Sequence, residues 1–304
     1  MGHRVVHIGD GGFISLHQGA MRIQRQGDEL ALIPLADLAC VVLDGYEIAL
    51  TAQIAAKLSE ENIALVFSDS KHLPCGVVQP LSANSIHAET LRLQAECSVP
   101  KKKRIWQQIV IAKLEAQADL LQLLGSRDKS VRAMIPLVRS GDPDNIEARA
   151  AARYWSKLMG DEFTRNTESP GANAMLNYGY ALIRSSVARC LSGTGLHPAL
   201  GVFHRNRYNA FALADDAMEP LRPLVDAFVH TYLKNNEPPD DLTPPIKQHL
   251  AKVLVLPVIF AGNDYTFLGG CERYAASLRR GICEESRKLE IPRPKWSAVF
   301  ESCG

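Results

Sequence analysis

A change in the spacing of apolar residues near His87 divides this chain of 304 residues into two parts. Before it, short runs rich in β-branched residues alternate with turns, which is typical of strands. After it, apolar residues recur every three or four positions, which is typical of helices. The sequence therefore predicts an α+β fold, with a small β-sandwich-like N-terminal domain over residues 1–85 and a larger all-α domain over residues 86–304. The expected strands are 4–8, 13–16, 21–24, 30–34, 40–43 and 64–67, with one helix among them at 51–61.

A glycine-rich segment, Gly9-Asp10-Gly11-Gly12, follows the first expected strand. A dinucleotide-binding loop would place its third glycine where Ile14 stands, and no G-K-[ST] phosphate loop occurs anywhere in the sequence. The segment therefore predicts a plain turn between two strands.

Residues 99–160 carry an excess of positive charge in a chain whose net charge is only +1. They hold 12 Lys and Arg against 6 Asp and Glu, whereas residues 1–98 hold 6 against 11. Four consecutive cations begin an expected helix over residues 101–124, where positive charge opposes the helix dipole. The run predicts either a solvated surface or a patch that contacts phosphates, and the uneven charge favours one phosphate-binding face. The four residues are Lys101, Lys102, Lys103 and Arg104.

The apolar residues and cysteines are distributed as in a protein of the cytoplasm. The strongest apolar run, 253–261, is short and is broken by Pro257, so no spanning helix is expected. The N-terminus lacks a charged and then apolar leader. The 7 cysteines are scattered and include no C-x-x-C pair, which argues against disulfides and structural zinc. We therefore expect a cytoplasmic protein with reduced thiols and no membrane segment.

An acidic residue, Glu147, stands in the first turn of a helix that the sequence predicts over residues 146–159. The preceding loop, 141–145, contains residues that favour a helix start. A carboxylate in the first turn is stabilised by the helix dipole, so an exposed residue without a function is the simplest interpretation. The small side chains of Ala150 and Ala151 leave space beside the carboxylate, so a functional role stays open.

Residues 171–226 combine a long helix, a polar loop and an acidic segment. We expect a helix over residues 172–191, followed by a glycine-rich break and a loop that contains His204. A lone histidine in a loop is often only structural. The D-x-x-E spacing of Asp216 and Glu219 predicts a capping box, which would account for both residues without any chemistry.

Two carboxylates and one imidazole would suit a hard divalent cation. Mg²⁺ and Mn²⁺ prefer oxygen ligands and keep positions for water and a phosphate oxygen. Such an ion can withdraw charge from a phosphodiester and orient an attacking hydroxyl, while Arg205 and Arg207 hold nearby phosphates. The chemistry indicated is phosphodiester cleavage or exchange. Spacing alone does not show that Glu147, His204 and Glu219 converge.

Three runs stand out in this part of the sequence: NAMLNYGY at 173–180, GVFHRNRYNAF at 201–211 and LADDAMEPLRPLVD at 213–226. They closely resemble the CRISPR-associated spacer integrase, the catalytic subunit of the CRISPR adaptation machinery, in the form found in type II systems. The segment around Glu147 is also similar to the family's helix that carries its first metal carboxylate. The layout of a β-rich part followed by a helical part agrees over nearly the whole chain.

The resemblance implies an N-terminal β domain that forms a homodimer and a helical catalytic domain that holds one Mg²⁺ or Mn²⁺. The residues that match the family's metal ligands and catalytic residues are Glu147, His204 and Glu219. Asp216 would be a capping or supporting residue beside the site. Glu219 stands where many family members carry Asp, so Asp216 is the alternative third ligand.

The resemblance also implies an activity and partners. Two dimers would flank a dimer of a small ferredoxin-like partner to form a heterohexamer, which carries a short DNA duplex. Each reactive 3′-OH would attack a phosphodiester at the CRISPR repeat and insert a spacer, and isolated members act as metal-dependent DNA endonucleases. The type II form adds the effector nuclease as a further partner. The residues expected to bind DNA are Lys101, Lys102, Lys103, Arg104, Arg205 and Arg207.

Two other functions fit the same residues. A DNA-binding scaffold with a degenerate metal site would account for the basic segment and the capping box. A stand-alone repair nuclease for branched DNA would share the site but lack the partner.

Overall fold

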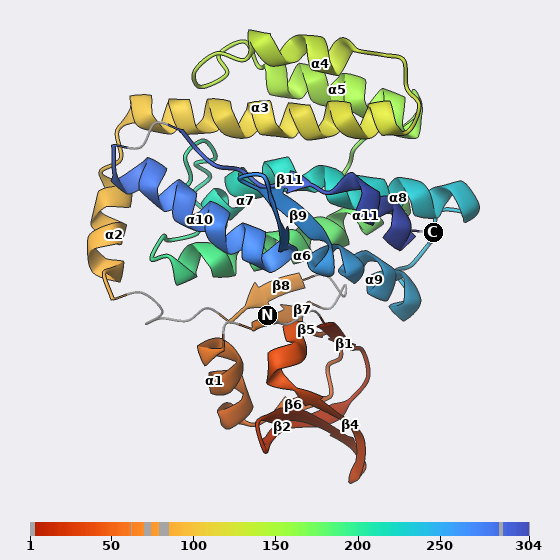
Figure 1. Ribbon diagram of the computed structural model, residues 1–304. Helices are drawn as coiled ribbons and strands as arrows, with labels where there is room; N and C mark the ends of the chain where they lie inside the picture. The colour runs from red at the N-terminus through yellow and green to blue at the C-terminus, as the bar shows by residue number, and fades with distance from the viewer. Residues whose placement is uncertain (1–3, 62, 70–73, 79–84, 286–287, 304) are drawn as a thin grey trace.

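The computed structural model describes residues 4–61, 63–69, 74–78, 85–285 and 288–303. The N-terminal strands lie below a larger body of helices (Figure 1). The predicted α+β class is therefore confirmed. The expected boundary between residues 85 and 86 falls just before the first helix of this body, and residues 79–84 lie outside the described part.

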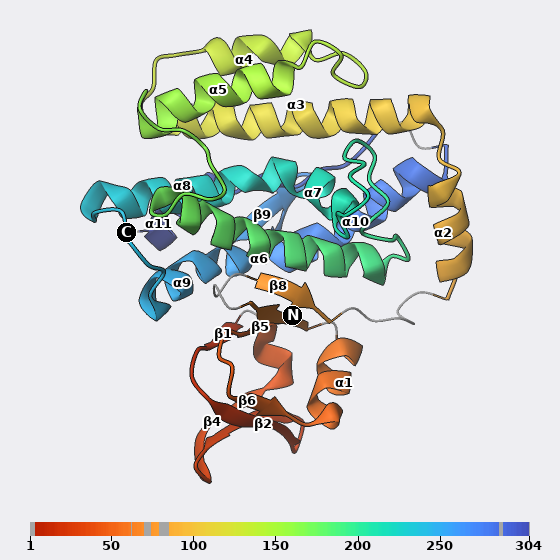
Figure 2. The same ribbon diagram turned by 180° about the vertical axis from the view of Figure 1, so that it is seen from behind.

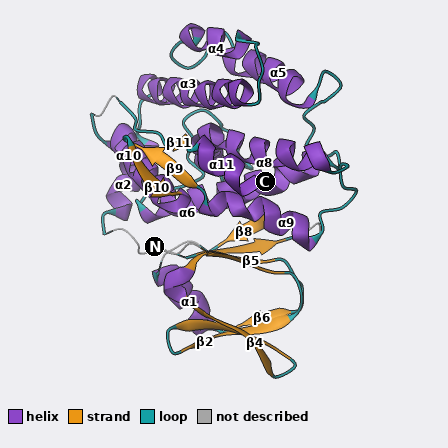
Figure 3. Cartoon of the chain, turned by 45° about the vertical axis from the view of Figure 1, so that its right-hand side comes forward, coloured by secondary structure: helices purple, strands orange, loops and turns teal. Residues whose placement is uncertain are grey.

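Two four-stranded sheets form the N-terminal part (Figure 3). Their strands are β1 (Arg4–Ile8), β2 (Gly12–His17), β3 (Ala20–Arg25), β4 (Asp28–Pro34), β5 (Leu38–Leu43), β6 (Ile48–Leu50), β7 (Ala64–Ser68) and β8 (Pro74–Val77). The first sheet has the order β4-β3-β2-β6 and the second has the order β1-β5-β7-β8, in which β1, β5 and β7 are parallel. The sequence predicts six of the eight strands. It misses β6 and β8, which are too short to show an alternating pattern.

The second sheet is buried on both faces because it separates two apolar cores. Cys40 and Val42 of β5 belong to the core of the helical body, whereas Val41 and Leu43 belong to the N-terminal core. Successive side chains of a strand point to opposite faces, so one continuous apolar run serves both cores. The N-terminal part is thus joined to the helices through a shared, packed sheet.

Helix α1 (Ala52–Glu60) packs against the first sheet and β7. The hydroxyl oxygen of Thr51 accepts a hydrogen bond from the backbone N–H of Ile54 at 3.4 Å, which caps the helix. Ile54 and Leu58 are four residues apart and both are buried in the N-terminal core. The helix predicted over residues 51–61 is confirmed.

A layer that contains α3 and α5 covers the helical body, at the top of Figure 1. The helices of this region are α2 (His87–Ala95), α3 (Val99–Leu123), α4 (Ser130–Met134) and α5 (Ile146–Met159). Helix α3 begins after Ser98 and has Pro100 in its first turn, where a fixed φ is tolerated. The helix predicted over 146–159 has those bounds in the structure.

Helix α6 lies at the centre of the remaining helices and is almost wholly buried. The helices of this second layer are α6 (Ala172–Gly193), α7 (Ala212–Met218), the 3₁₀ turn η3 (Glu219–Leu221), α8 (Arg222–Asn235), α9 (Pro244–Ala251), α10 (Phe267–Cys283) and α11 (Trp296–Cys303). A Cβ on Gly179 of α6 would lie 2.4 Å from Val225 Cγ1 of α8. The glycine therefore lets α8 approach α6 closely.

The helical body is not all-α, which corrects the prediction. Three strands, β9 (Pro257–Phe260), β10 (Asn263–Thr266) and β11 (Arg293–Pro294), form an antiparallel sheet of order β10-β9-β11. Strands of two to four residues are too short to interrupt a helical pattern visibly. Helix α10 packs on this sheet, since a Cβ on Gly270 would lie 2.3 Å from Val258 Cγ2.

In the described part of the chain, no helix combines the length and the apolar character that crossing a membrane requires. The cysteines that the structure describes in detail are free thiols, as the sequence predicts. They are Cys40, Cys75, Cys97, Cys190, Cys271 and Cys283.

Candidate active site

Helix α3 forms one wall of the candidate site. Trp106 and Lys113 lie seven residues apart on α3, and therefore on one face, and both are buried. Helix α3 packs against α5, α7 and η3, and it lies between α5 above and α7 below (Figures 1 and 2). The predicted ligands come from the elements that meet here: Glu147 from α5, Glu219 from η3 and His204 from the loop between α6 and α7.

The position of Glu147 is fixed by the side chain of Asp142. The carboxylate of Asp142 accepts hydrogen bonds from the backbone N–H groups of Ile146 and Glu147, both at 2.9 Å. Asp142 thereby satisfies two of the amide groups that a helix start leaves unpaired. The predicted capping chemistry of loop 141–145 is confirmed, and the side chain of Glu147 reaches α3.

Asp216 and Glu219 do not form the capping box that their spacing predicts. Helix α7 begins at Ala212, so Asp216 is its fifth residue rather than its cap. Glu219 begins η3, and both carboxylates are buried. The prediction was wrong because a D-x-x-E pattern caps a helix only where the helix starts at the aspartate. Here the helix has already started one turn earlier.

The ammonium of Lys113 lies between two of the predicted ligands. Its Nζ is 2.6 Å from Oε2 of Glu219 and also contacts Oε1 of Glu147. On the other side of Glu219, Nη2 of Arg222 is 3.0 Å from Oε1. The pKa of Glu219 is held below its usual value because Arg222 and Lys113 together outweigh the opposing effect of burial. Burial lowers the pKa of Lys113, but the two carboxylates outweigh it, so this pKa is raised.

The ring of His204 is held by Asp216. Its Nδ1 is 2.5 Å from Oδ1 of Asp216, and the same carboxylate accepts the backbone N–H groups of Val202, Phe203 and His204 at 2.7, 2.9 and 3.2 Å. A carboxylate with these four contacts acts as an acceptor, so Nδ1 of His204 is the donor and Nε2 is left without the proton in the neutral ring. The hydrogen bond to Asp216 raises the pKa of His204, against the effect of burial.

The residues present fit a hard divalent cation by the chemistry of their donors. Glu147 and Glu219 already converge on one cation, the ammonium of Lys113, and carboxylate oxygens are the ligands that Mg²⁺ and Mn²⁺ prefer. His204 adds one oriented nitrogen. The oxygens of Asp216 are already taken by four hydrogen bonds, which favours Glu219 over Asp216 as the third ligand. Within the described residues no three such side chains form a ready-made ligand cluster, and Lys113 lies between the two carboxylates.

Three of the predicted DNA-binding residues share a cavity with His204. This cavity of about 610 Å³ is lined by His204, Lys102, Arg205 and Arg207, among others. The guanidinium of Arg207 also lies over the ring of Tyr208, 4.6 Å from its centroid. The positive charges on this side of His204 could therefore meet phosphates that flank a reacting group.

The rest of the basic run points elsewhere, because consecutive helical residues are rotated by about 100°. The Nζ of Lys101 donates hydrogen bonds to the carbonyl oxygens of Ile282 and Glu284, at 3.3 and 2.8 Å. Lys101 therefore ties α3 to the end of α10. Lys103 and Arg104 are exposed.

Two further charged residues of the site, Lys113 and Arg222, were not predicted from the sequence. Lys113 interrupts the apolar stripe of α3, and a lysine at a core position is a signal that a buried partner of opposite charge is present. Arg222 follows Glu219 at the i+3 spacing that brings helical side chains together. Neither residue could be assigned to the site before the structure showed their contacts.

A further carboxylate, Asp226, is buried beside the site. It accepts a hydrogen bond from the hydroxyl of Tyr154 at 2.7 Å and another from the hydroxyl of Tyr180. Burial raises the pKa of Asp226 to about 6, although the two hydrogen bonds act in the opposite direction. The guanidinium of Arg222 lies over the ring of Tyr180, 4.8 Å from its centroid, which connects this cluster to Glu219.

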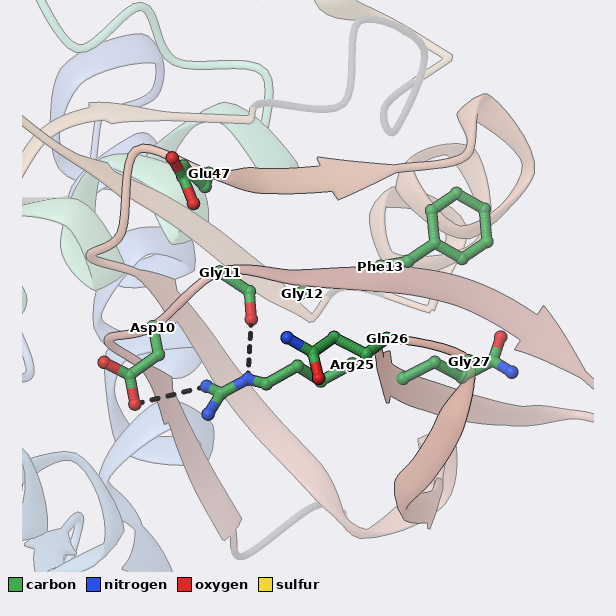
Figure 4. Close-up of a pocket in the computed structure, with 9 residues that line it drawn as sticks. Asp10, Gly11, Gly12, Phe13, Arg25, Gln26, Gly27 and Glu47 are labelled. Atoms are coloured by element: carbon green, nitrogen blue, oxygen red, sulfur yellow. Dashed lines mark hydrogen bonds and ion pairs between the residues drawn. The ribbon is translucent and has the colours of Figure 1, made fainter.

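A second cavity, of about 780 Å³, lies in the N-terminal part beside the glycine-rich segment (Figure 4). Nε of Arg25 donates a hydrogen bond to the carbonyl oxygen of Gly11 at 3.0 Å, and the guanidinium pairs with exposed Asp10 at 3.2 Å. Strand β2 follows the segment, whereas a phosphate loop must open a helix whose first N–H groups bind the phosphate. The predicted plain turn is confirmed.

Comparison with known proteins places the chain in a family. Residues 5–243 match the family described as CRISPR associated protein Cas1. The CRISPR-associated endonuclease Cas1 of Neisseria meningitidis serogroup C (strain 8013) is 38% identical over 292 residues, which cover 95% of this chain and 95% of that protein.

Solved structures share the fold. A casposase bound to an integration product has a TM-score of 0.77 and 16% identity, over 94% of this chain and 92% of that one. A chain of a Cas6-RT-Cas1–Cas2 complex has a TM-score of 0.69 and 18% identity, over 93% of this chain and 35% of that one. The family match spans most of the sequence, and the Neisseria relative matches nearly all of it. The chain therefore belongs to the CRISPR-associated Cas1 family.

Proposed function

We propose that this protein is a metal-dependent DNA endonuclease and integrase that inserts short DNA fragments into a CRISPR array, as a step of antiviral defence. A DNA 3′-OH attacks a phosphodiester, so one phosphodiester replaces another and no ATP is required. The observation that carries the proposal is the convergence of Glu147 and Glu219 on one cation. The endonuclease named in Neisseria and the integration product bound by the casposase are consistent with this chemistry.

Each residue of the site has a separate proposed role. When bound, Mg²⁺ or Mn²⁺ supplies charge withdrawal from the phosphodiester and orientation of the attacking hydroxyl. Glu147, Glu219 and Nε2 of His204 would hold it. Asp216 keeps His204 in the tautomer that leaves Nε2 available, and Arg222 neutralises the buried charge of Glu219.

The protein is proposed to act on double-stranded DNA as a homodimer that assembles with a small ferredoxin-like partner into a heterohexamer. The structural relative that is a Cas6-RT-Cas1–Cas2 complex supports a partner in general. The type II effector nuclease is a further proposed partner. Lys102, Arg205 and Arg207 line a cavity together with His204, which supports the proposal that they bind DNA there.

A strand-transfer assay with Mg²⁺ or Mn²⁺ tests the proposal. We expect Glu147→Ala, His204→Ala and Glu219→Ala each to abolish transfer, since each removes one ligand. Glu60→Ala, which removes an exposed carboxylate on α1, is the matched control and should leave transfer unchanged. Undiminished transfer in all three site variants would contradict the assignment of these residues as metal ligands.

Fluorescence binding with and without metal, run beside cleavage and strand-transfer assays, separates the two other functions. A scaffold would bind duplex DNA at every metal concentration and leave it intact. A repair nuclease would cleave branched DNA but would not join a 3′-OH to a new phosphodiester. Ion pairing of both carboxylates with Lys113 favours an active site over a degenerate one, because it keeps the buried carboxylate of Glu219 close to the partly exposed carboxylate of Glu147.

A further inference from the structure

An aromatic ring stands exposed beside His204. The ring of Phe203 stacks on Trp106, with centroids 4.2 Å apart and planes 3° apart, yet 45% of Phe203 is exposed. Trp106 is fully buried on α3. One face of the Phe203 ring is therefore supported by the protein.

The position of this ring is fixed by the machinery that fixes His204. The backbone N–H of Phe203 donates to Oδ2 of Asp216 at 2.9 Å, while Oδ1 of the same carboxylate binds the imidazole of His204. The two rings are nearly perpendicular, with centroids 5.4 Å apart. An apolar ring held in this way has already lost most of its conformational freedom, so a ligand that stacks on it has little further ordering cost.

The surroundings of the ring identify the chemistry of the ligand. His204, whose ring contacts that of Phe203, lines a cavity together with Lys102, Arg205 and Arg207, and none of the described residues that line it is acidic. An aromatic ring beside a strip of cations is the combination that binds single-stranded nucleic acid, in which bases stack on rings and cations meet the phosphates. A base inside a duplex has both faces covered by its neighbours, so only an unpaired base can use such a ring.

We propose that Phe203 is the stacking platform for the unpaired nucleobase at the reacting 3′ end of the DNA strand. This inference rests on the proposed strand-transfer function and assigns a positioning residue to it. Stacking holds the terminal nucleotide so that its 3′-OH lies beside His204. The platform has no hydrogen-bonding groups of its own, so it accepts any base and is insensitive to sequence.

The test combines two substrates with substitutions at Phe203. The substrates are a DNA with an unpaired 3′-terminal nucleotide and the same DNA with an abasic site at that nucleotide. Loss of one stacked base weakens binding of the strand by about tenfold or more. We therefore expect the wild-type protein to transfer the abasic substrate about tenfold less efficiently, which requires no substitution.

Phe203→Leu should transfer the intact substrate about tenfold less efficiently than the wild-type protein does. On the abasic substrate, the variant and the wild-type protein should be equally efficient. Phe203→Tyr keeps the ring and should retain wild-type behaviour on both. Phe13→Leu removes a ring of similar exposure, 44%, from β2 and is the matched control. A 2-aminopurine at the 3′ terminus reports stacking directly, and its fluorescence should be quenched by the wild-type protein and by Phe203→Tyr but not by Phe203→Leu.

Equal losses of Phe203→Leu on both substrates, or no loss at all, would overturn the inference. So would unquenched 2-aminopurine in the wild-type complex. These results leave the proposed function standing as long as the wild-type protein performs strand transfer and His204→Ala does not. If the wild-type protein transfers no strand, the proposed function fails instead. The melting temperature of each variant confirms that it is folded.

Discussion

The Nζ of Lys113 lies 2.6 Å from Oε2 of Glu219 in a place where only 8% of the lysine side chain is exposed. The same ammonium contacts Glu147, so one buried positive charge holds two carboxylates together. Two carboxylates that contact the same ammonium would repel one another without a cation between them. The lysine therefore supplies, within the protein alone, part of the charge that a divalent ion would bring.

Replacement of Lys113 by methionine should lower stability and increase the response to metal. Without the ammonium, the buried carboxylate of Glu219 loses a partner, and loss of one member of a buried ion pair costs about 3 to 5 kcal/mol. We expect Lys113→Met to melt at a lower temperature in EDTA than the wild-type protein. Mn²⁺ should raise the melting temperature of the variant more than that of the wild type, because the ion replaces the missing charge.

The matched control for this experiment is Lys157→Met. Lys157 is exposed and lies 4.0 Å from Asp128, and an exposed pair of this kind contributes at most about 1 kcal/mol. The control should match the wild type both in EDTA and in Mn²⁺. A Lys113→Met variant that melts like the wild type in EDTA would contradict the structural role of the lysine.

Asp216→Asn should weaken metal-dependent activity and change its pH dependence. The hydrogen bond to Asp216 raises the pKa of His204, so the protonated ring persists to higher pH in the wild type. Metal binding needs the neutral ring, and activity should therefore rise as pH rises through this raised pKa. In Asp216→Asn the pKa falls, so the rise should occur at lower pH, while the maximal rate drops by about 10- to 100-fold because the ring loses its orientation.

NMR titration of His204 together with the pH profile of strand transfer checks this prediction. Asp215→Asn is the neighbouring control. Asp215 accepts a hydrogen bond from Asn209 at 2.7 Å and does not replace Asp216 as the partner of the ring. A larger effect of Asp215→Asn than of Asp216→Asn would contradict the assignment of Asp216 as the residue that orients His204.

Lys101 and Lys102 are adjacent in sequence but should differ in their effect on DNA binding. Lys102 lines the cavity that contains His204, whereas Lys101 is hydrogen-bonded to carbonyl groups at the end of α10. We expect Lys102→Met to weaken DNA binding and to reduce the slope of log K against log salt concentration by about 1. Lys101→Met should leave that slope unchanged and lower the melting temperature. The opposite pattern would place the DNA on the α10 side of α3.

Much of the fold could be predicted because long periodic segments determine their own structure. The helix over residues 146–159 has a clear start in its loop and a continuous pattern, and its bounds agree with the structure. Strand β5 could be predicted because all six of its residues are buried, which gives an unbroken apolar run in the sequence. Strands β9 to β11 were missed because two to four residues in a helical context carry no usable period. Their pairing depends on contacts between distant parts of the chain.

The candidate site was predictable only in part, for a physical reason. A ligand set is a relationship between distant elements, and the sequence shows residue types but not distances. The D-x-x-E pattern suggested a helix cap, whereas Asp216 binds the loop of His204 and Glu219 binds Lys113. The resemblance to a family proposed Glu147, His204 and Glu219 as the ligands. It gave no indication of Lys113, which only the packing of α3 against η3 brings to the site.

Asp226 should make the stability of the protein depend on pH. Burial raises its pKa to about 6, above the value near 3.9 that is usual for an unfolded chain. The folded state therefore favours the protonated form. The stability from this group is fully present below the unfolded pKa and is lost as pH rises through the folded pKa.

Between pH 4 and pH 7, we expect the free energy of unfolding of the wild type to fall by on the order of 3 kcal/mol relative to that of Asp226→Asn. One pKa unit corresponds to about 1.4 kcal/mol. Urea denaturation at several pH values measures this difference. Tyr154→Phe removes a hydrogen bond that stabilises the charged carboxylate, so it should shift the loss to higher pH. A difference between wild type and Asp226→Asn that is constant over this range would show that Asp226 is ionised throughout.

The joint between the N-terminal sheet and the helices contains a buried ion pair whose removal should be costly. The Nζ of Lys247 in α9 is 2.6 Å from Oδ2 of Asp44, just after β5, and both side chains are at most 4% exposed. Nε2 of His7 lies 3.2 Å from the same oxygen. Lys247→Met leaves the buried charge of Asp44 without its ammonium, so the free energy of unfolding should fall by about 3 to 5 kcal/mol.

The double variant Asp44→Leu/Lys247→Met should be more stable than Lys247→Met alone, because it removes the buried carboxylate of Asp44 together with the ammonium of Lys247. Arg139→Met provides the comparison with an exposed pair, since Arg139 and Asp144 lie 2.7 Å apart with exposed fractions of 68% and 43%. That substitution should cost less than about 1 kcal/mol. Urea denaturation measures the free energy of unfolding of the three variants and tests these expectations. If Lys247→Met cost no more than Arg139→Met, apolar packing of the shared sheet, rather than the ion pair, would hold the two parts together.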